Sequence, residues 1–269
     1  MQTLESHTRA PCVAGLFYPD DPTRLEFLLK QLYQAADREG LAKGYRPRAI
    51  VAPHAGYIYS GAIAANAYSS ILSRAADIKR VVVLGPSHQI AFNGAACPSA
   101  TKFATPLGDI DLDVAEIKRL EAQGLVSIND AAHVREHSIE VQLPFLQHIL
   151  ADFKLIPIVV GMSDPFPIAA ILESYWNAED ALIVISSDLS HYLEYYDAKN
   201  TDQDTTASIE ACRWQDIGPH QACGCYPLRG LLQLGREENC KATCIDLRNS
   251  GDTAGDKSRV VGYGAYVFE

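Results

Sequence analysis

The hydrophobic positions of this chain follow two patterns. Four runs are almost continuously apolar, at residues 49–52, 80–85, 155–160 and 181–186, which is typical of strands buried on both faces of a parallel sheet. Around them lie segments whose apolar residues recur at helical spacing, at residues 21–37, 61–72, 111–123, 138–150 and 165–176. This alternation predicts an α/β fold with a mostly parallel or mixed central sheet flanked by helices.

The remaining segments are less regular. The first helix has Asp21 as its expected N-cap and Pro22 as its first residue, whereas the helix at residues 138–150 contains Pro144 near its middle. Residues 91–109 indicate an irregular loop or a hairpin. We expect helices at residues 204–213 and 226–234, followed by two strands, at 243–247 and 260–268, that pair antiparallel. Because no linker-like segment divides these elements, we expect a single domain over residues 1–269.

Composition narrows the classes of function. The 269 residues are 48% hydrophobic and carry a net charge of -10, and this acidic balance argues against a general nucleic-acid binder. The first nine residues are polar and lack the apolar core of a signal peptide, and no segment reaches the roughly 20 apolar residues that cross a bilayer. We therefore expect a cytoplasmic protein with no membrane association.

Three of the expected strands are followed by a histidine. His54, His88 and His191 each come shortly after the end of an apolar run. In an open α/β sheet, ligands bind in the crevice beyond the carboxyl ends of the parallel strands. A β-α-β unit places His54 and His88 at the same edge of the sheet, so the histidines can converge on a metal.

The surroundings of these histidines supply further candidates. Glycines near His54 allow a tight turn that fixes the direction of the imidazole, although they are also compatible with a simple strand-to-helix connection. Tyr59 and Ser87, close to His54 and His88, are candidates for the same pocket. Asp188, three residues before His191, can orient that ring for proton transfer or cap a following helix, and both roles are compatible with the sequence.

Seven cysteines in irregular positions indicate free thiols rather than a disulfide framework. Cys223 and Cys225 precede an expected helix, and either can bind a metal. A structural zinc site is the alternative, built from Cys223, Cys225, Cys240 and Cys244, although their spacing differs from the usual zinc knuckles. His137 and Glu140 are spaced to share a helix face and can line the same pocket, or be solvated.

Several segments together resemble the Memo family, also called AmmeMemoRadiSam system protein B, whose fold is similar to the class III extradiol dioxygenases. The resemblance rests on Pro11–Pro19, Pro53–Gly61, Leu84–His88, Glu136–Phe145 and Ser186–His191. It implies that His54 and His88 are metal ligands, that His191 acts as an acid/base, and that Asp188 lies in the same pocket. It also implies a cysteine as third ligand where the dioxygenases have a carboxylate, and Cys223 matches that position better than Cys225.

These residues support three functional hypotheses. The first is a metal-dependent oxidoreductase that holds Fe(II) or copper with two histidines and a cysteine, acts on a small molecule and uses His191 to move protons. The second is a non-catalytic binding or assembly protein, with the radical-SAM and AMMECR1-like proteins that the family's system name implies as partners. The third is zinc-assisted hydrolysis with His191 as base. Ligand types alone do not identify the metal.

Overall fold

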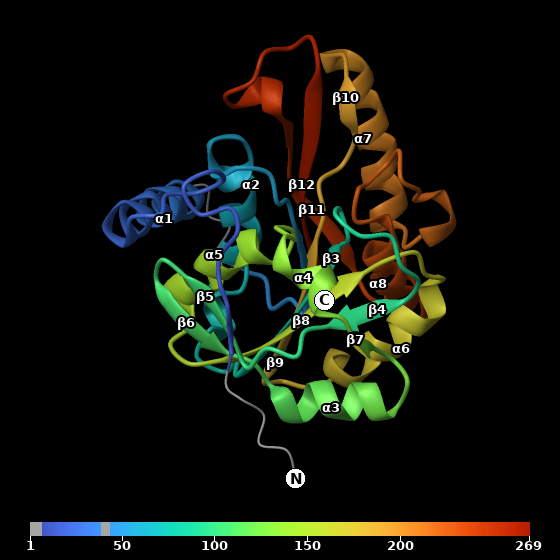
Figure 1. Cartoon of the computed structure of the whole chain (residues 1–269). Coiled ribbons are helices and arrows are strands. Elements are labelled where there is room, and N and C mark those ends of the chain that lie inside the picture. The colour runs from blue at the N-terminus through green and yellow to red at the C-terminus, as the bar shows by residue number, and fades with distance from the viewer. Residues whose placement is uncertain (1–6, 39–43) are drawn as a thin grey trace.

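The centre of the structure is a sheet of four parallel strands. The computed structural model describes residues 7–38 and 44–269 (Figure 1). The parallel strands lie in the order β2 (Ala49–Ala52), β9 (Ala181–Ser186), β3 (Arg80–Pro86) and β8 (Lys154–Val160). Their side chains are nearly all buried, as their uninterrupted apolar sequences predict. The predicted α/β class with a mixed central sheet is therefore confirmed.

Antiparallel strands extend this sheet on both sides. Beside β2 lies β12 (Val260–Phe268), which also pairs with β11 (Ala242–Asn249) and β10 (His191–Leu193). Beside β8 lie β4 (Ala95–Cys97) and then β7 (Ser127–Ile128). A separate small sheet joins β1 (Thr8–Arg9), β5 (Lys102–Thr105) and β6 (Gly108–Asp111). The expected antiparallel pair near the C-terminus is confirmed, and residues 91–109 contain β4, β5 and part of β6 within the predicted irregular segment.

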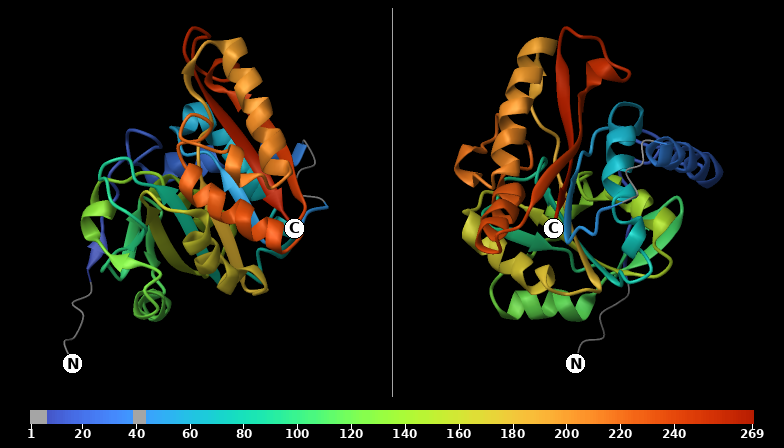
Figure 2. Two further views of the ribbon diagram at one scale, coloured as in Figure 1. Left: turned by 90° about the vertical axis from the view of Figure 1, so that its right-hand side faces the viewer. Right: turned by 180° about the vertical axis from the view of Figure 1, so that it is seen from behind.

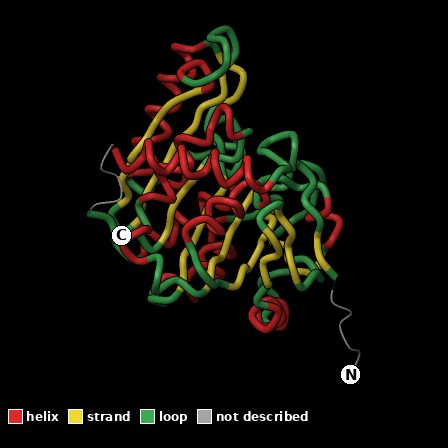
Figure 3. The backbone as a smooth tube through the Cα atoms, turned by 90° about the vertical axis from the view of Figure 1, so that its left-hand side faces the viewer, coloured by secondary structure: helices red, strands yellow, loops and turns green. Residues whose placement is uncertain are grey.

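Helices cover both faces of the sheet (Figures 2 and 3). They are α1 (Pro22–Arg38), α2 (Tyr57–Ser69), α3 (Val114–Ala122), α4 (Asp130–Val134), α5 (Leu143–Ile149), α6 (Pro165–Trp176), α7 (Tyr195–Glu210) and α8 (Cys225–Glu237). Helices α6 and α8 pack together on one face, and α2 and α5 lie on the other with α1 outside them. Both α2 and α7 contact the long β11–β12 hairpin. No helix among the described residues has the length and apolar character that a membrane span requires.

Three predicted helix boundaries were wrong for local reasons. Pro144 does not interrupt a helix over 138–150: it lies in the first turn of α5, and a 3₁₀ turn, Glu140–Gln142, precedes it. Helix α2 begins at Tyr57, four residues early, because Gly56 is its N-cap and accepts the Ser60 backbone N–H at 3.1 Å. Helix α7 begins at Tyr195, since its polar first turns carry no apolar stripe that the sequence could reveal.

A buried ion pair anchors the N-terminal segment to the centre of the chain. Arg9 contacts Glu140, whose carboxylate also accepts the Tyr18 hydroxyl at 2.6 Å and the backbone N–H groups of Cys12 at 2.8 Å and Val13 at 3.0 Å. Burial opposes ionisation of Glu140, but the Arg9 charge and these hydrogen bonds outweigh it and lower its pKa. Glu140 is therefore a structural carboxylate.

We expect Glu140→Gln to lower the free energy of unfolding by about 3 kcal/mol, because it leaves Arg9 buried without its partner. The lowered pKa means that the charge of Glu140 stabilises the fold above its unfolded pKa of about 4.3, and that this contribution is lost as the pH falls through the folded value. Urea titrations between neutral and acidic pH measure both effects. Asp216→Asn, in the exposed pair with Arg213, is the control and leaves stability nearly unchanged. Equal stability of Glu140→Gln and wild type would contradict this role.

Candidate metal centre

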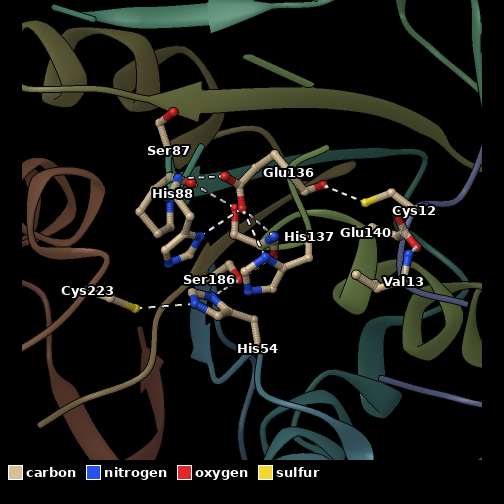
Figure 4. A network of polar contacts seen from close by, with 12 residues as sticks. Cys12, Val13, His54, Ser87, His88, Glu136, His137, Glu140, Ser186 and Cys223 are labelled. Carbon is tan, nitrogen blue, oxygen red and sulfur yellow. Dashed lines mark hydrogen bonds and ion pairs between the residues drawn. The ribbon is translucent and has the colours of Figure 1, made fainter. Parts of the chain in front are cut away.

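Sheet order brings the candidate ligands together. Strands β2, β9 and β3 are neighbours and parallel, so their carboxyl ends open on one edge of the sheet. His54 follows β2, His88 follows β3, and Cys223 precedes α8. One donor atom from each of these three residues lies within 4.8 Å of the other two (Figure 4). Two imidazoles and a thiol at this spacing are a suitable ligand set for a transition metal.

The ring of His54 is held in one tautomer. The Ser186 hydroxyl donates its only proton to the Ser138 carbonyl, so it must accept the hydrogen bond that joins it to His54 Nδ1 at 2.9 Å. Gln142 donates a further hydrogen bond to this hydroxyl at 2.8 Å. His54 Nδ1 therefore carries the hydrogen, and Nε2 presents its lone pair 3.2 Å from Cys223 Sγ. A metal needs this free lone pair.

A carboxylate holds His88 in the same manner. Glu136 Oε1 lies 2.8 Å from His88 Nδ1, and Glu136 Oε2 accepts the backbone N–H of His88 at 2.6 Å. Burial opposes ionisation of this carboxyl group, but the hydrogen bonds from His88 hold its pKa at about 2. The anion favours hydrogen on Nδ1 and leaves the lone pair of His88 Nε2 available to a metal.

The thiol of Cys223 lies against the end of β9. Its sulfur accepts the backbone N–H of Asp188 at 3.3 Å, and the backbone N–H of Gly224 donates to the Ser187 hydroxyl at 3.0 Å. A Cβ on Gly224 would lie 2.7 Å from Ser187 Cβ, so glycine permits this close approach. Burial, followed by the charge of Asp188, raises the pKa of Cys223 well above its ordinary value. A bound cation reverses this preference, because it stabilises the thiolate directly.

The ligand set lies in a cleft of about 1310 Å³ that also contains His137, Asp188, His191 and Tyr59. His191 Nδ1 lies 2.8 Å from the Leu189 carbonyl oxygen, which can only accept a hydrogen bond. The ring of His191 therefore carries its hydrogen on Nδ1 and has Nε2 free for proton transfer.

Asp188 positions its neighbours. Its Oδ1 accepts the backbone N–H of His54 at 2.7 Å, and its carbonyl oxygen accepts the backbone N–H of Cys223 at 3.3 Å. It caps no following helix, because the chain continues into β10. Burial raises the pKa of Asp188 to about 6. Asp188 thus links the segments of two candidate ligands.

A second group of possible ligands overlaps the first. His88, Glu136 and His137 also have donor atoms within 4.8 Å of one another. The ring of His137 stacks on that of His88, with centroids 4.6 Å apart, and burial lowers its pKa. Glu136 already bonds to His88, which belongs to the first candidate ligand set. We therefore treat Glu136 and His137 as neighbours of that site and not as a second site.

Some sequence candidates lie elsewhere. Glu140 is fully buried in the pair with Arg9 and does not line the cleft with His137, because the 3₁₀ turn directs it to the other side. The Ser87 hydroxyl donates to the Ile90 carbonyl and lies outside the cleft lining. The structural zinc alternative is wrong for the residues described: Cys225, Cys240 and Cys244 do not join Cys223 in a metal-sized cluster. The sequence pattern allowed either Cys223 or Cys225 to bind a metal, and in the structure Cys223 is the one that lies beside His54.

The comparisons with known proteins cover nearly the whole length of the chain. The family model for the Memo-like protein matches residues 9–267. The chain belongs to the Memo family. A MEMO1 family protein of Aquifex aeolicus is 35% identical across 97% of this chain and 98% of its own length. One from Aeropyrum pernix is 36% identical across 96% and 98%, and one from Archaeoglobus fulgidus is 32% identical across 97% and 99%.

Sequence reasoning did not assign the residues that orient the ligands in this Memo family member. Ser186 and Glu136 contact the imidazoles directly, and Ser138 and Gln142 hold the Ser186 hydroxyl in place. The available signal was their position, since all four lie in the two segments that also carry His137 and His191. Ser186, a polar residue at the end of an apolar strand, needs a buried partner, and one of its partners is the candidate ligand His54.

We expect Glu136→Gln to weaken metal binding by about 10- to 100-fold, because the carboxylate that orients His88 loses its charge. Titration with Zn²⁺ against a competing chelator measures the change. The matched control is Glu26→Gln, which alters an exposed carboxylate 3.1 Å from His148, away from the cleft, and should leave affinity unchanged. Circular dichroism verifies folding. Wild-type affinity in a folded Glu136→Gln protein would show that this contact does not tune a metal ligand.

Proposed function

We propose that this protein is a metal-dependent oxidoreductase acting on a small molecule, with His54, His88 and Cys223 as ligands for iron or copper. The observation that carries the proposal is the convergence of these three donors in a cleft that also contains His191. The similarity to class III extradiol dioxygenases, which the family resemblance implies, is part of this proposal. Iron or copper held here would supply one-electron chemistry and open coordination positions.

The chain's own residues define the remaining chemistry. Nε2 of His191 is free to take a proton from a substrate hydroxyl or thiol and to return it, while the Leu189 carbonyl fixes the ring. We assign Asp188 to positioning, since its carboxylate accepts the His54 backbone N–H. Burial raises its pKa only to about 6, so the group still carries negative charge at neutral pH. Tyr59 forms part of the wall beside the candidate ligands.

A binding or assembly role is the second candidate, and a specific observation favours it. Apolar side chains are exposed at the cleft, with Leu16 at 79% and Ile58 at 71% exposure. Such side chains near a pocket are typical of contact sites for other molecules. In this alternative the pocket holds a metal, small molecule or peptide without turnover, and the radical-SAM and AMMECR1-like proteins are the proposed partners.

The proposal is tested with protein purified without oxygen or chelating tags and loaded with Fe(II), copper or zinc. After removal of free metal, oxygen uptake is measured with ascorbate as reductant. We expect near-stoichiometric metal, and uptake at least about tenfold faster with iron or copper than with zinc, the redox-inert control. Cys223→Ser should lose both metal and uptake. Stoichiometric metal with equal rates for all three metals would contradict an oxidoreductase and favour zinc-assisted hydrolysis or binding.

We expect His191→Gln to keep the wild-type metal content and to lower oxygen uptake by about 100-fold, because it removes a proton carrier that is not a ligand. Elemental analysis and the oxygen electrode measure the two quantities on one sample. His220→Gln, a change at another histidine of the cleft, is the control for general disturbance. Loss of metal in His191→Gln would make His191 a ligand and overturn its assignment.

A further inference from the structure

Two thiols outside the cleft face each other at the ends of two helices. Cys212 follows the C-terminal end of α7, and Cys240 follows that of α8. Their Sγ atoms are 3.9 Å apart and share a hydrogen bond. Neither residue lines the cleft. Within residues 7–38 and 44–269, no other two cysteine sulfurs lie within hydrogen-bonding distance.

The backbone around this pair makes room for it. A Cβ on Gly235 would lie 2.7 Å from Cys240 Sγ and 3.2 Å from Cys212 Sγ, so a larger residue would displace the thiols. The backbone N–H of Cys240 donates to the Gly235 carbonyl at 2.9 Å, which turns the chain back over the end of α8. Cys212 has a φ of 50°, a left-handed conformation that non-glycine residues rarely adopt. Both backbones thus direct their sulfurs to one point.

We propose that Cys212 and Cys240 form a reversible disulfide on exposure to a hydroperoxide, joining the C-terminal ends of α7 and α8. A disulfide requires the sulfurs at about 2.0 Å, so small side-chain movements complete the approach. Cys240 is partly exposed, which gives a small oxidant access to the pair.

The reaction balances with hydrogen peroxide as the oxidant. The Cys212 thiolate attacks one peroxide oxygen, an S–O bond forms as the O–O bond breaks, and the departing hydroxide takes a proton to become water. The Cys240 sulfur then attacks the sulfenic sulfur, the S–S bond forms as the S–O bond breaks, and a second water leaves. Two thiols are oxidised and one peroxide is reduced. The hydrogen bond from Cys240 lowers the pKa of Cys212, which favours Cys212 as the first nucleophile.

Helices α7 and α8 lie next to different parts of the candidate site. Asp202 of α7 accepts the backbone N–H of Ser190 at 3.0 Å, next to His191, and α8 begins two residues after Cys223. A covalent link between their far ends would restrict both helices without touching a ligand. We therefore expect the disulfide to stabilise the protein and to leave metal content unchanged.

Zinc-loaded full-length protein is treated with hydrogen peroxide and digested without reductant, and its peptides are identified by mass spectrometry. We expect one linked peptide containing Cys212 and Cys240, reversed by dithiothreitol, and a melting temperature raised by about 5 °C. Cys240→Ser should abolish both, and Cys244→Ser, a change at another partly buried cysteine, should abolish neither. Peroxide that oxidises other cysteines but leaves this pair as thiols, or links Cys240 to Cys244, would overturn the proposal. Because neither thiol lines the cleft, this result does not depend on the proposed oxidoreductase function.

Discussion

The end of strand β9 is the constraint on which the candidate site depends. The Ser186 hydroxyl fixes the hydrogen of His54 on Nδ1, and the carboxylate of Asp188 holds the His54 backbone. The carbonyl oxygen of Asp188 accepts the Cys223 backbone N–H, while its own N–H contacts the Cys223 sulfur. Because β9 lies between β2 and β3, these contacts are made where all three strands end. Two of the three ligand candidates are therefore positioned by Ser186 and Asp188 at the end of one strand.

Burial gives this arrangement its chemical character. Burial, followed by the charges of neighbouring histidines, lowers the pKa of His54 and keeps its imidazole neutral. Burial also keeps the Cys223 thiol protonated until a cation is present. The buried amide of Gln142 beside them is paired: it donates to Ser186 and to the Pro53 carbonyl, and its oxygen accepts the Tyr68 hydroxyl. A paired network of this kind holds ligands in place before a metal binds, which reduces the reorganisation that binding requires.

Much of the fold was predictable because its strongest signals are local. The runs that became β2 and β9 are short and apolar except for Ser186 at the end of β9. Asp21 and Pro22 begin α1 as expected, with Asp21 accepting the Arg24 N–H at 2.8 Å. The shared location of His54 and His88 followed from the handedness of β-α-β units. The sequence pattern could not predict that Glu140 lies outside the cleft, because its location depends on a contact with Arg9, 131 residues away in sequence. The contact between Cys223 and the end of β9 also joins residues far apart in sequence, 35 positions in this case, so only the family resemblance selected this cysteine.

The most direct test of this account is X-ray absorption spectroscopy of the zinc-loaded protein, compared with Cys223→Ser. We expect one sulfur at about 2.3 Å and two imidazole nitrogens at about 2.0–2.1 Å from the metal, with the sulfur absent in the variant. A metal surrounded only by nitrogen and oxygen in the wild-type protein would contradict a centre built from His54, His88 and Cys223.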